Sequence, residues 1–283
     1  MIFFRHIGQA IAAALAFFAI GALANENSMP KRVVSMNLCT DQLAMLLAGP
    51  GQLRSVSYLA SDPSASAMAE EARGYHANRG LAEEVFLMRP DLVIAGTFTT
   101  RATVDMLKRL DIPVVEFAPA NSMDDVRARV REMGIALGRQ TDAERLVARF
   151  DADLAAARAE GTSRPRTALY YANSYTLGAG MLAHSVLEAA GLSNLAVELG
   201  YEGGGRLPLE TLVMEVPDLI VTGRDLKGAS LASDSLAHPA LAALRANAAA
   251  APVADRDWVC GTPFIVEAIR RLATARDAVL AER

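Results

Sequence analysis

Two glutamates, Glu83 and Glu210, open stretches of the sequence that match each other in spacing. The first stretch reads EEVFLMRPDLVIAG and the second reads ETLVMEVPDLIVTG; in each, Glu lies seven residues before Pro-Asp-Leu and Gly lies six residues after the Pro. Paired carboxylates on a rigid scaffold suit recognition of a basic partner, because complementary charges orient an encounter and set its register. A solvated carboxylate at a common helix-to-strand connection explains either stretch alone. The duplication favours a docking role.

Signatures of common catalytic and metal sites are missing from the sequence. There is no GxSxG elbow, no HExxH pair and no dinucleotide glycine fingerprint after a strand, so we expect no enzyme activity. The glycines of YEGGGR are not followed by Lys-Ser or Lys-Thr, so this segment is not a phosphate-binding loop. We expect a mobile loop at the cleft or a plain surface loop. Beyond the N-terminal segment, His76, His184 and His238 show no HxH or HxxxH spacing, which disfavours a bare zinc or manganese site.

The two cysteines, Cys39 and Cys260, each follow a predicted strand, one in each half of the chain. With so few cysteines we expect that disulfides do not hold the protein together, and we favour two buried, unlinked thiols. Two alternatives stay open: both sulfurs contact a metal complex, or they oxidise to a bond that locks the halves together. A Cα separation above about 7 Å would exclude that bond without a movement of the halves.

The N-terminus has the pattern of a secretory signal. Arg5 and His6 precede an apolar run over 7–23, and small residues end at Ala24, so we expect cleavage after Ala24 and export to the periplasm; an uncleaved anchor is the alternative. Removal of 1–24 takes away one Arg and no acid, which changes the formal charge from −4 to −5. This acidic balance, without a basic stripe, argues against a nucleic-acid partner.

Short apolar runs rich in β-branched residues alternate with segments of helical period, which is typical of parallel sheets covered by helices. The predicted strands cover 32–36, 55–58, 91–95 and 113–117 in the first half, and 167–172, 218–222 and 252–254 in the second. A helix over 41–47, with Thr40 as its N-cap and Gly49 at its end, follows the first strand.

A helical segment separates the two halves. One helix is predicted over 122–137 and ends at Gly138, and a second opens with a Thr141-to-Glu144 capping box and runs to about residue 160. Twenty helical residues span about 30 Å, the diameter of a small domain, so such a rod can join two lobes and set their separation. An ordinary surface helix of one domain is the alternative.

In this arrangement the sequence resembles the periplasmic substrate-binding proteins of ABC importers that take up cobalamin, ferric siderophores and haem. The resemblance covers nearly all of 31–280 and rests on RVVSMNLCTDQLAMLLAG, VSYLASDP, NRGLAEEVFLMRPDLVIAG and LDIPVVEF, followed by GAGMLAHSVLEAAGLSNL and LPLETLVMEVPDLIVTG. It implies that one surface glutamate per lobe docks onto arginines of a dimeric permease. These positions match Glu83 and Glu210, with Glu84 as the fallback.

The expected fold is α/β, with two Rossmann-like lobes whose parallel-rich sheets are joined by a long rigid α-helix, and with a ligand cleft between the lobes. The expected divisions are a signal peptide over 1–24, an N-terminal lobe over 31–121, a helical connector over 122–162 and a C-terminal lobe over 163–283. The connecting helix should limit hinge motion to modest rocking.

Ligands of open α/β sheets lie beyond the carboxyl ends of the strands, so the residues that follow each strand are the candidates. Aromatic and amide side chains among them suit a large ring system with polar edges. The candidates are Asn37, Cys39, Tyr58, Asn78, Arg79, Thr97 and Phe98 in the first half, and Asn173, Tyr175, Tyr201, Arg206, Trp258 and Cys260 in the second. Trp258, the sole tryptophan, is equally compatible with lobe packing.

The resemblance therefore implies a monomeric periplasmic receptor that carries a bulky metal chelate, cobalamin or a ferric siderophore, to an inner-membrane ABC permease dimer with its ATPase subunits. The chelate is cargo, and no resident cofactor is expected. Haem is an alternative ligand, with Tyr58, Tyr175, Tyr201 or His184 as axial ligand. A bare divalent metal is the other alternative.

Overall fold

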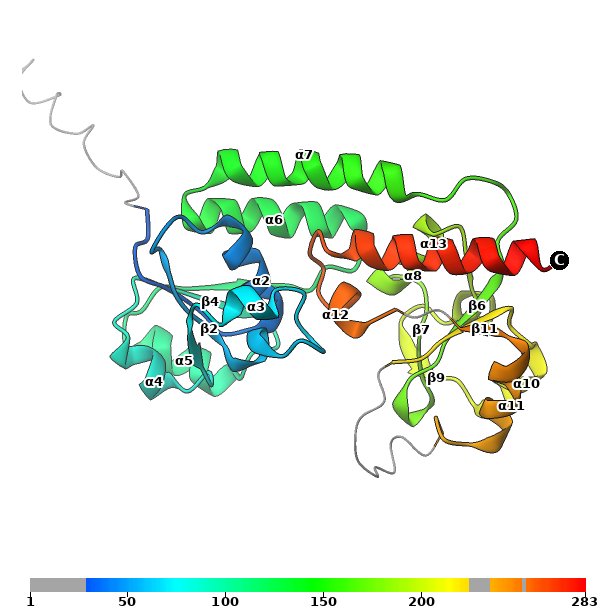
Figure 1. The fold of residues 1–283 in the computed structure, drawn as a ribbon. Coiled ribbons are helices and arrows are strands. Elements are labelled where there is room, and N and C mark those ends of the chain that lie inside the picture. Colours follow the sequence, from blue (N-terminus) through cyan, green and yellow to red (C-terminus); the bar gives the residue numbers. More distant parts are fainter. Residues whose placement is uncertain (1–28, 224–234, 251–252) are drawn as a thin grey trace, which may run out of the picture.

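The structure is a computed structural model and describes residues 29–223, 235–250 and 253–283. Two sheets, each covered by helices, form two lobes, and helices α6 and α7 run along one side of both (Figure 1). The expected signal segment lies outside the described residues, so cleavage after Ala24 stays a prediction. None of the helices within the described ranges is long and apolar enough to cross a membrane.

The N-terminal lobe contains a five-stranded, all-parallel sheet in the order β3-β2-β1-β4-β5. Its strands are β1 (Val33–Ser35), β2 (Leu53–Ser57), β3 (His76–Asn78), β4 (Leu92–Gly96) and β5 (Val114–Phe117). Its helices are α2 (Leu38–Leu47), α3 (Ala69–Ala72), α4 (Ala82–Leu87) and α5 (Arg101–Arg109), with a 3₁₀ turn η1 (Tyr58–Ser61). The strand order reverses between β1 and β4, which makes the carboxyl ends of these strands the expected ligand edge.

The C-terminal lobe contains a four-stranded parallel sheet in the order β11-β10-β6-β8 and a two-stranded antiparallel ribbon, β7-β9. The strands are β6 (Arg166–Leu169), β7 (Tyr175–Leu177), β8 (Ser193–Asn194), β9 (Gly204–Arg206), β10 (Leu219–Val221) and β11 (Ala249–Ala250). The helices are α8 (Leu182–Ala189), α9 (Leu195–Glu198), α10 (Leu209–Glu215), α11 (Pro239–Asn247), α12 (Asp255–Trp258) and α13 (Ile265–Ala281), with a 3₁₀ turn η2 (Ala172–Ser174).

Two predicted strands of this lobe differ from the structure. The strand expected over 167–172 ends at Leu169. The strand expected over 252–254 begins at a residue outside the described ranges, and Val253 and Ala254 are not in a strand. The edge strand is β11 instead, where Ala249 pairs with Leu219 of β10. Val253 packs in the core beside Trp258, so its apolar side chain reflects burial and not strand pairing.

Helices α6 (Met123–Leu137) and α7 (Gln140–Ala157) form a hairpin that spans both lobes. Met123 and Phe150 belong to the core of the C-terminal lobe, whereas Met133 and Val147 belong to the core of the N-terminal lobe. The turn between the helices uses Gly138 at φ 69°, a left-handed conformation that favours glycine. Because both helices are anchored in both cores, the lobes rest on a stiff helical pair (Figure 1).

Two expected helix starts are wrong. Helix α2 begins three residues earlier than predicted, and its N-cap is Asn37, whose side chain accepts hydrogen bonds from the backbone of Cys39 and Thr40. The capping box does not form, because α7 already starts at Gln140 and Glu144 pairs with Arg131 of α6 at 2.8 Å. Ser122 does cap α6 through the N–H of Asp125.

The repeated Pro-Asp pair has a structural role in each lobe. In the N-terminal lobe, the Asp91 carboxylate accepts from Arg32 N at 2.7 Å, and Asp91 N donates to Arg32 O at 3.1 Å. The Arg32 Nε donates to the carbonyl of Arg89 at the end of α4, where Arg89 takes a left-handed φ of 49° before the proline. The Asp thus ties the end of a helix to the start of the first strand.

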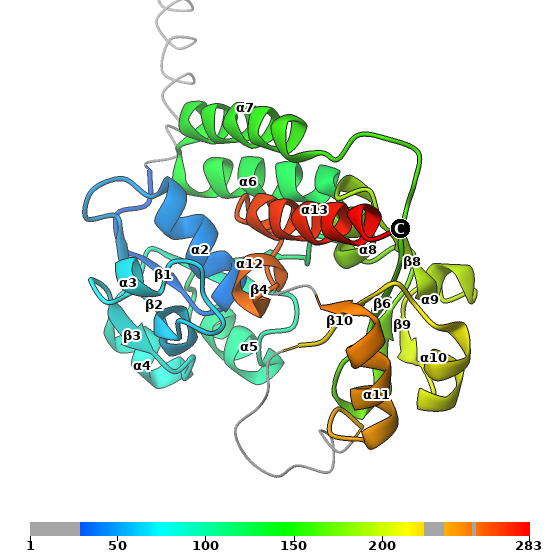
Figure 2. The same ribbon diagram turned by 45° about the vertical axis from the view of Figure 1, so that its right-hand side comes forward.

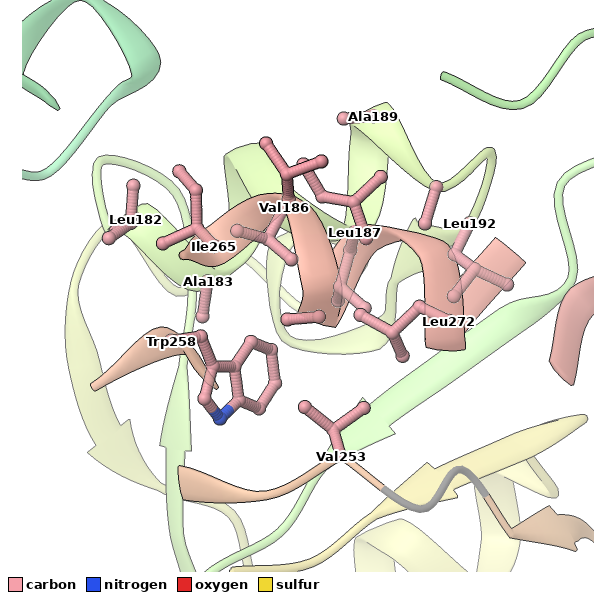
Figure 3. Packing of buried hydrophobic residues seen from close by; sticks show 14 of the residues in the cluster. Leu182, Ala183, Val186, Leu187, Ala189, Leu192, Val253, Trp258, Ile265 and Leu272 are labelled. Atoms are coloured by element: carbon pink, nitrogen blue, oxygen red, sulfur yellow. The ribbon is translucent and has the colours of Figure 1, made fainter. Parts of the chain in front are cut away.

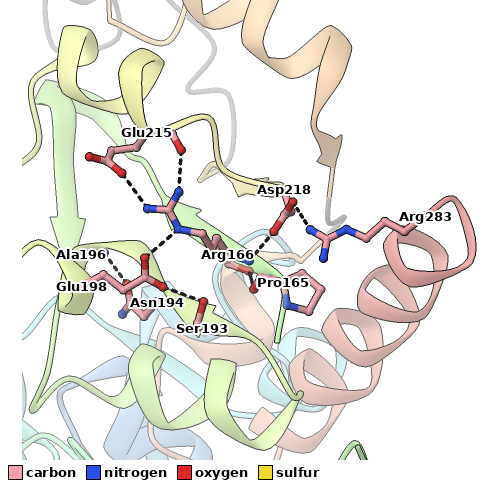
Figure 4. A network of polar contacts seen from close by, with 10 residues as sticks. Pro165, Arg166, Ser193, Asn194, Ala196, Glu198, Glu215, Asp218 and Arg283 are labelled. Carbon is pink, nitrogen blue, oxygen red and sulfur yellow. Dashed lines mark hydrogen bonds and ion pairs between the residues drawn. The ribbon is translucent and has the colours of Figure 1, made fainter. Parts of the chain in front are cut away.

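The C-terminal lobe repeats this clamp. Asp218 accepts from Arg166 N at 2.7 Å, Asp218 N donates to Arg166 O at 2.9 Å, and the Arg166 guanidinium donates to the Glu215 carbonyl at 2.7 Å (Figure 4). Val216, at φ 45°, precedes the proline as Arg89 does in the other lobe. Arg166 also bonds the carboxylates of Glu215 and Glu198, each within 2.8 Å. The Arg partner lies more than fifty residues before its Asp, which the local pattern does not reveal.

The largest buried cluster lies in the C-terminal lobe. Figure 3 shows Ile265 and Leu272 of α13 facing Val186 and Leu187 of α8, with Trp258 below them. Trp258 is 8% exposed, so most of its indole contributes to this core. Burial of a Leu or Ile side chain stabilises a fold by about 1.5–3 kcal/mol, so this contact fixes α13 firmly in the lobe.

Candidate functional site

Two adjoining cavities lie between the lobes at the carboxyl ends of the strands. The Phe98 cavity, of about 210 Å³, is lined by Asn37, Cys39, Thr40, Leu43, Gly96, Thr97, Phe98, Phe117, Ala118, Pro119, Ala120, Arg129, Val259 and Gly261. The Trp258 cavity, of about 370 Å³, is lined by Pro119, Ala120, Asn121, Tyr171, Leu177, Met181, Leu182, Ala183, Asp255, Trp258 and Val259. Pro119, Ala120 and Val259 line both cavities, so the two cavities lie side by side and together form the candidate cleft.

The N-terminal wall of the cleft is positioned by strand ends. Asn37 follows β1, Thr97 and Phe98 follow β4, and Ala118 follows β5, so parallel strands deliver these residues to one edge. Phe98 is 86% exposed, an unusual state for a large apolar side chain. A ring exposed at the edge of a cavity is suited to stack on a flat or apolar ligand face.

The C-terminal wall combines aromatic rings with a carboxylate. Tyr171 lies just beyond the end of β6, and Trp258 and Asp255 come from α12. Burial raises the pKa of the Tyr171 phenol, and the nearby Asp255 carboxylate raises it further. The hydroxyl therefore stays protonated at neutral pH. The neutral phenol can donate a hydrogen bond but carries no negative charge.

Cys39 and Cys260 are joined in a disulfide, which corrects the expectation of two unlinked thiols and of a protein not held by disulfides. Their Cα atoms are 5.1 Å apart although the residues are 221 positions apart in sequence. Cys39 opens α2 in the N-terminal lobe and Cys260 follows α12 in the C-terminal lobe, so the bond crosses the cleft beside the Phe98 cavity. Neither sulfur is a free thiolate that could ligate a metal.

Other contacts also hold the lobes together at this point. Arg256 of α12 donates to the carbonyl of Pro63 in the N-terminal lobe at 3.3 Å. Next to the disulfide, Gly261 passes so close to Ala120 that a Cβ at residue 261 would overlap the Ala120 side chain. The cleft thus lies between lobes that are linked by the disulfide and by the α6–α7 hairpin.

Several predicted ligand residues lie outside both cavities. Asn78 is fully buried, and its amide nitrogen donates to Ser35 O and Ser55 Oγ, both at 2.8 Å, so its donors are already engaged within the N-terminal sheet. Arg79 is exposed, and its N–H donates to Glu84. Tyr58 is 56% exposed beyond the carboxyl end of β2.

The remaining candidates also line neither cavity: Tyr175 and Arg206 lie in the β7–β9 ribbon, Asn173 lies in η2, Tyr201 precedes β9, and Cys260 is bonded to Cys39. The YEGGGR segment is not the loop we expected, because Gly204–Arg206 pairs with Tyr175–Leu177. A Cβ at Gly204 would overlap the Tyr175 hydroxyl, and one at Gly205 would lie 2.6 Å from the Tyr201 ring. These glycines make room for aromatic rings, and the Tyr201 hydroxyl donates to Arg206 O at 2.7 Å.

The two duplicated glutamates are on the surface. Glu83 lies in the first turn of α4 and Glu210 in the first turn of α10, and both are exposed. The fallback residue Glu84 is partly buried and accepts from Arg79 N at 2.8 Å. Figures 1 and 2 place α4 and α10 on the side of the molecule away from α7, one helix in each lobe.

Asp41 is a buried carboxyl beneath the cleft that sequence reasoning did not select as a site. It accepts from Ser57 N at 3.1 Å and from Ser57 Oγ at 2.5 Å, next to Tyr58. Desolvation raises the pKa of Asp41 to about 6, although hydrogen bonds from Ser35 and Ser57 oppose this rise.

Three kinds of cleft residue were missed. Tyr171 would have been found had the strand been ended at Leu169, because the rule selects residues that follow a strand. Pro119 and Ala120 follow β5 and were overlooked under the same rule. Asp255 and Val259 come after the strand expected over 252–254, but only Trp258 and Cys260 were selected from this segment.

Comparisons with known proteins agree with this geometry. Residues 33–250 match the model of the family described as "Periplasmic binding protein". A cobalamin-binding protein of Halobacterium salinarum is 26% identical over 259 residues, which cover 88% of this chain and 70% of that protein.

Two solved structures show the same fold. The periplasmic heme-binding protein RhuT from Roseiflexus sp. RS-1 has a TM-score of 0.71 at 24% identity, and the match covers 88% of this chain and 99% of that one. The vitamin B12-binding protein BtuF of Vibrio cholerae has a TM-score of 0.64 at 16% identity, with 89% and 98% covered. Since the family model spans more than half of the sequence, the chain belongs to the periplasmic binding protein family.

Proposed function

We propose that this protein captures a bulky metal chelate, cobalamin or a ferric siderophore, in the periplasm and delivers it to an ABC importer of the inner membrane. The observation that carries the proposal is the pair of adjoining cavities at the carboxyl edges of both sheets, with walls from both lobes. Its walls are mainly apolar and aromatic with a few polar groups, the composition of small-molecule sites. The cobalamin-binding relative from Halobacterium salinarum supports this class of ligand.

Each part of the cleft has a role in binding. Phe98, Val259 and Trp258 supply apolar contact for the faces of a ring system. Thr97 and the Tyr171 hydroxyl bond polar groups at the rim of the ligand, which fix its orientation. Because the disulfide already holds the lobes together, little ordering of the protein opposes binding. Lobe motion is limited to modest rocking.

Haem is a second candidate ligand, and exposed phenols favour it. Tyr58 is 56% exposed in the N-terminal lobe and Tyr175 is 42% exposed in the C-terminal lobe, and a Tyr oxygen can ligate haem iron. A bare divalent cation has no comparable support. Within the described ranges no group of three or more His, Cys, Asp or Glu is arranged to hold a metal ion.

Delivery uses Glu83 and Glu210 as contacts to the permease dimer, whose ATPase subunits drive transport. Both carboxylates are exposed in first turns of corresponding helices, whereas Glu84 already bonds the Arg79 backbone. A basic residue on each permease subunit would complete the pair. Such contacts act mainly on the association rate and on the choice of partner.

Trp258 provides the test of the ligand class, because it lines the cleft and is the only tryptophan. The purified protein is titrated with cyanocobalamin, with several ferric siderophores and with haemin, while Trp258 emission is followed. Saturable quenching by one chelate is expected, and a Phe98→Ala variant should bind that chelate about tenfold more weakly. Ile135→Ser, an exposed change on α6, is the matched control. Emission indifferent to every chelate would reject the proposal.

A further inference from the structure

Helices α4 and α10 expose large apolar side chains next to the proposed docking glutamates. Sixteen large apolar residues are exposed among those that the structure describes. Six of them belong to these two short helices and their caps: Leu81, Phe86, Leu87, Val213, Met214 and Val216. Apolar side chains gathered in this way mark interaction surfaces more often than scattered ones do.

The arrangement is the same in both lobes. In α4, Phe86 and Leu87 lie three and four residues after Glu83, and in α10, Val213 and Met214 lie three and four residues after Glu210. Residues at these spacings lie on the same face of a helix as the first residue. Leu87 and Met214 hold equivalent positions and are 78% and 82% exposed.

The lobe cores do not account for these side chains. Val85 and Leu212 are the residues that anchor α4 and α10, and both are fully buried. The clamp to the first strand uses the Pro-Asp pair beyond each helix. The glutamate and the apolar pair of each helix therefore remain exposed to solvent. Both helices lie on the side of the molecule away from α7 (Figures 1 and 2).

We infer that Phe86 with Leu87 and Val213 with Met214 are the apolar half of two matching docking surfaces, and that Glu83 and Glu210 are the acidic half. The partner that fits is a two-fold symmetric membrane permease, because a homodimer presents the same patch twice. Each copy of its patch places a basic side chain next to an apolar hollow. This inference rests on the proposed function and adds to it the contacts that hold the complex.

The two halves of each surface have different effects on the complex. Exposed glutamates speed association and select a basic partner, but they contribute little to its lifetime. Buried apolar side chains at the centre of an interface lower the dissociation rate. Two copies of this chain fit each other poorly through these surfaces, because Glu83 and Glu84 in α4 and Glu210 in α10 would meet like charges.

The experiment measures binding of the ligand-loaded protein to its permease–ATPase complex in lipid nanodiscs. Leu87→Ser and Met214→Ser should each raise the dissociation constant about tenfold, and the double variant about a hundredfold, mainly through faster dissociation. Ile135→Ser, which removes a 65% exposed side chain on the far face, should change it less than about twofold. Quenching of Trp258 by the chelate should be unchanged in all variants.

The outcomes separate this inference from the proposed function. If the wild-type protein binds no chelate or no permease, the proposed function itself is rejected. If the wild type binds both and the double variant docks as well as Ile135→Ser does, the apolar surfaces are not docking contacts. Analytical sedimentation of the free protein supplies the remaining check. If the wild type is a dimer and Leu87→Ser and Met214→Ser convert it to a monomer, the surfaces serve self-association and the inference is overturned.

Discussion

Replacing Asp41 by Asn should stabilise the protein at neutral pH and leave it little changed in acid. Burial raises the pKa of Asp41 from 3.8 to about 6, so the folded state holds a proton that the unfolded state releases. Stability contributed by this group is therefore fully present below about pH 4 and is lost as pH rises toward 6. Above pH 6 the folded protein carries a desolvated charge.

The size of the effect follows from the shift. A rise of about two pKa units corresponds to about 3 kcal/mol, since one unit equals about 1.4 kcal/mol. The amide introduced by Asp41→Asn would be neutral at every pH, and its side-chain oxygen can still accept from Ser57 N and Oγ. The free energy of unfolding of this variant should thus be up to about 3 kcal/mol larger than that of the wild type at pH 7.5.

Denaturant unfolding without reductant, followed by circular dichroism between pH 4.5 and 7.5, measures this difference. Subtracting the wild-type curve removes the other titrating groups, and Asp105→Asn, at an exposed carboxylate on α5, is the control. The gap between Asp41→Asn and wild type should widen with pH, while the control gap stays flat. A gap that is constant with pH, or a variant less stable than wild type at pH 7.5, would refute the reasoning.

Two further changes test the contacts that hold the lobes. The Cys39→Ser/Cys260→Ser variant should lose about 5 kcal/mol of stability, because the disulfide closes a loop of 221 residues. Its thermal unfolding midpoint should fall by about 10 °C and match that of the reduced wild-type protein. An unchanged midpoint would contradict a stabilising disulfide. Arg166→Ala should lower the free energy of unfolding by about 1 to 2 kcal/mol, because the Glu215 carbonyl and the carboxylates of Glu198 and Glu215 lose their hydrogen-bond donor. Arg149→Ala, at an exposed site on α7, should change it little in the same denaturant assay. Equal effects of the two Arg variants would argue against the clamp.

Local patterns in the sequence determined the buried central strands and several helix boundaries, whereas the short strands β3, β7, β8, β9 and β11 were not predicted. Buried parallel strands such as β4 appear as continuous apolar runs, and Gly138 marks the end of α6 because few other residues adopt its left-handed conformation. The spacing of Glu83 and Glu210 before Pro-Asp likewise placed both on the first turns of corresponding helices. In each case the physical cause acts within a few residues, so the sequence reveals it.

Only the tertiary structure decided which distant residues meet. The Cys39–Cys260 bond and the Arg166–Asp218 clamp join residues 221 and 52 positions apart, and no local periodicity encodes such pairs. Asn78 was expected to face the ligand, yet it is the last residue of β3 and is fully buried, with its amide donating to Ser35 O of β1. The wall formed by Tyr171, Val259 and Trp258 depends on how α12 packs between the lobes, because burial and cavity shape arise when all elements are in place.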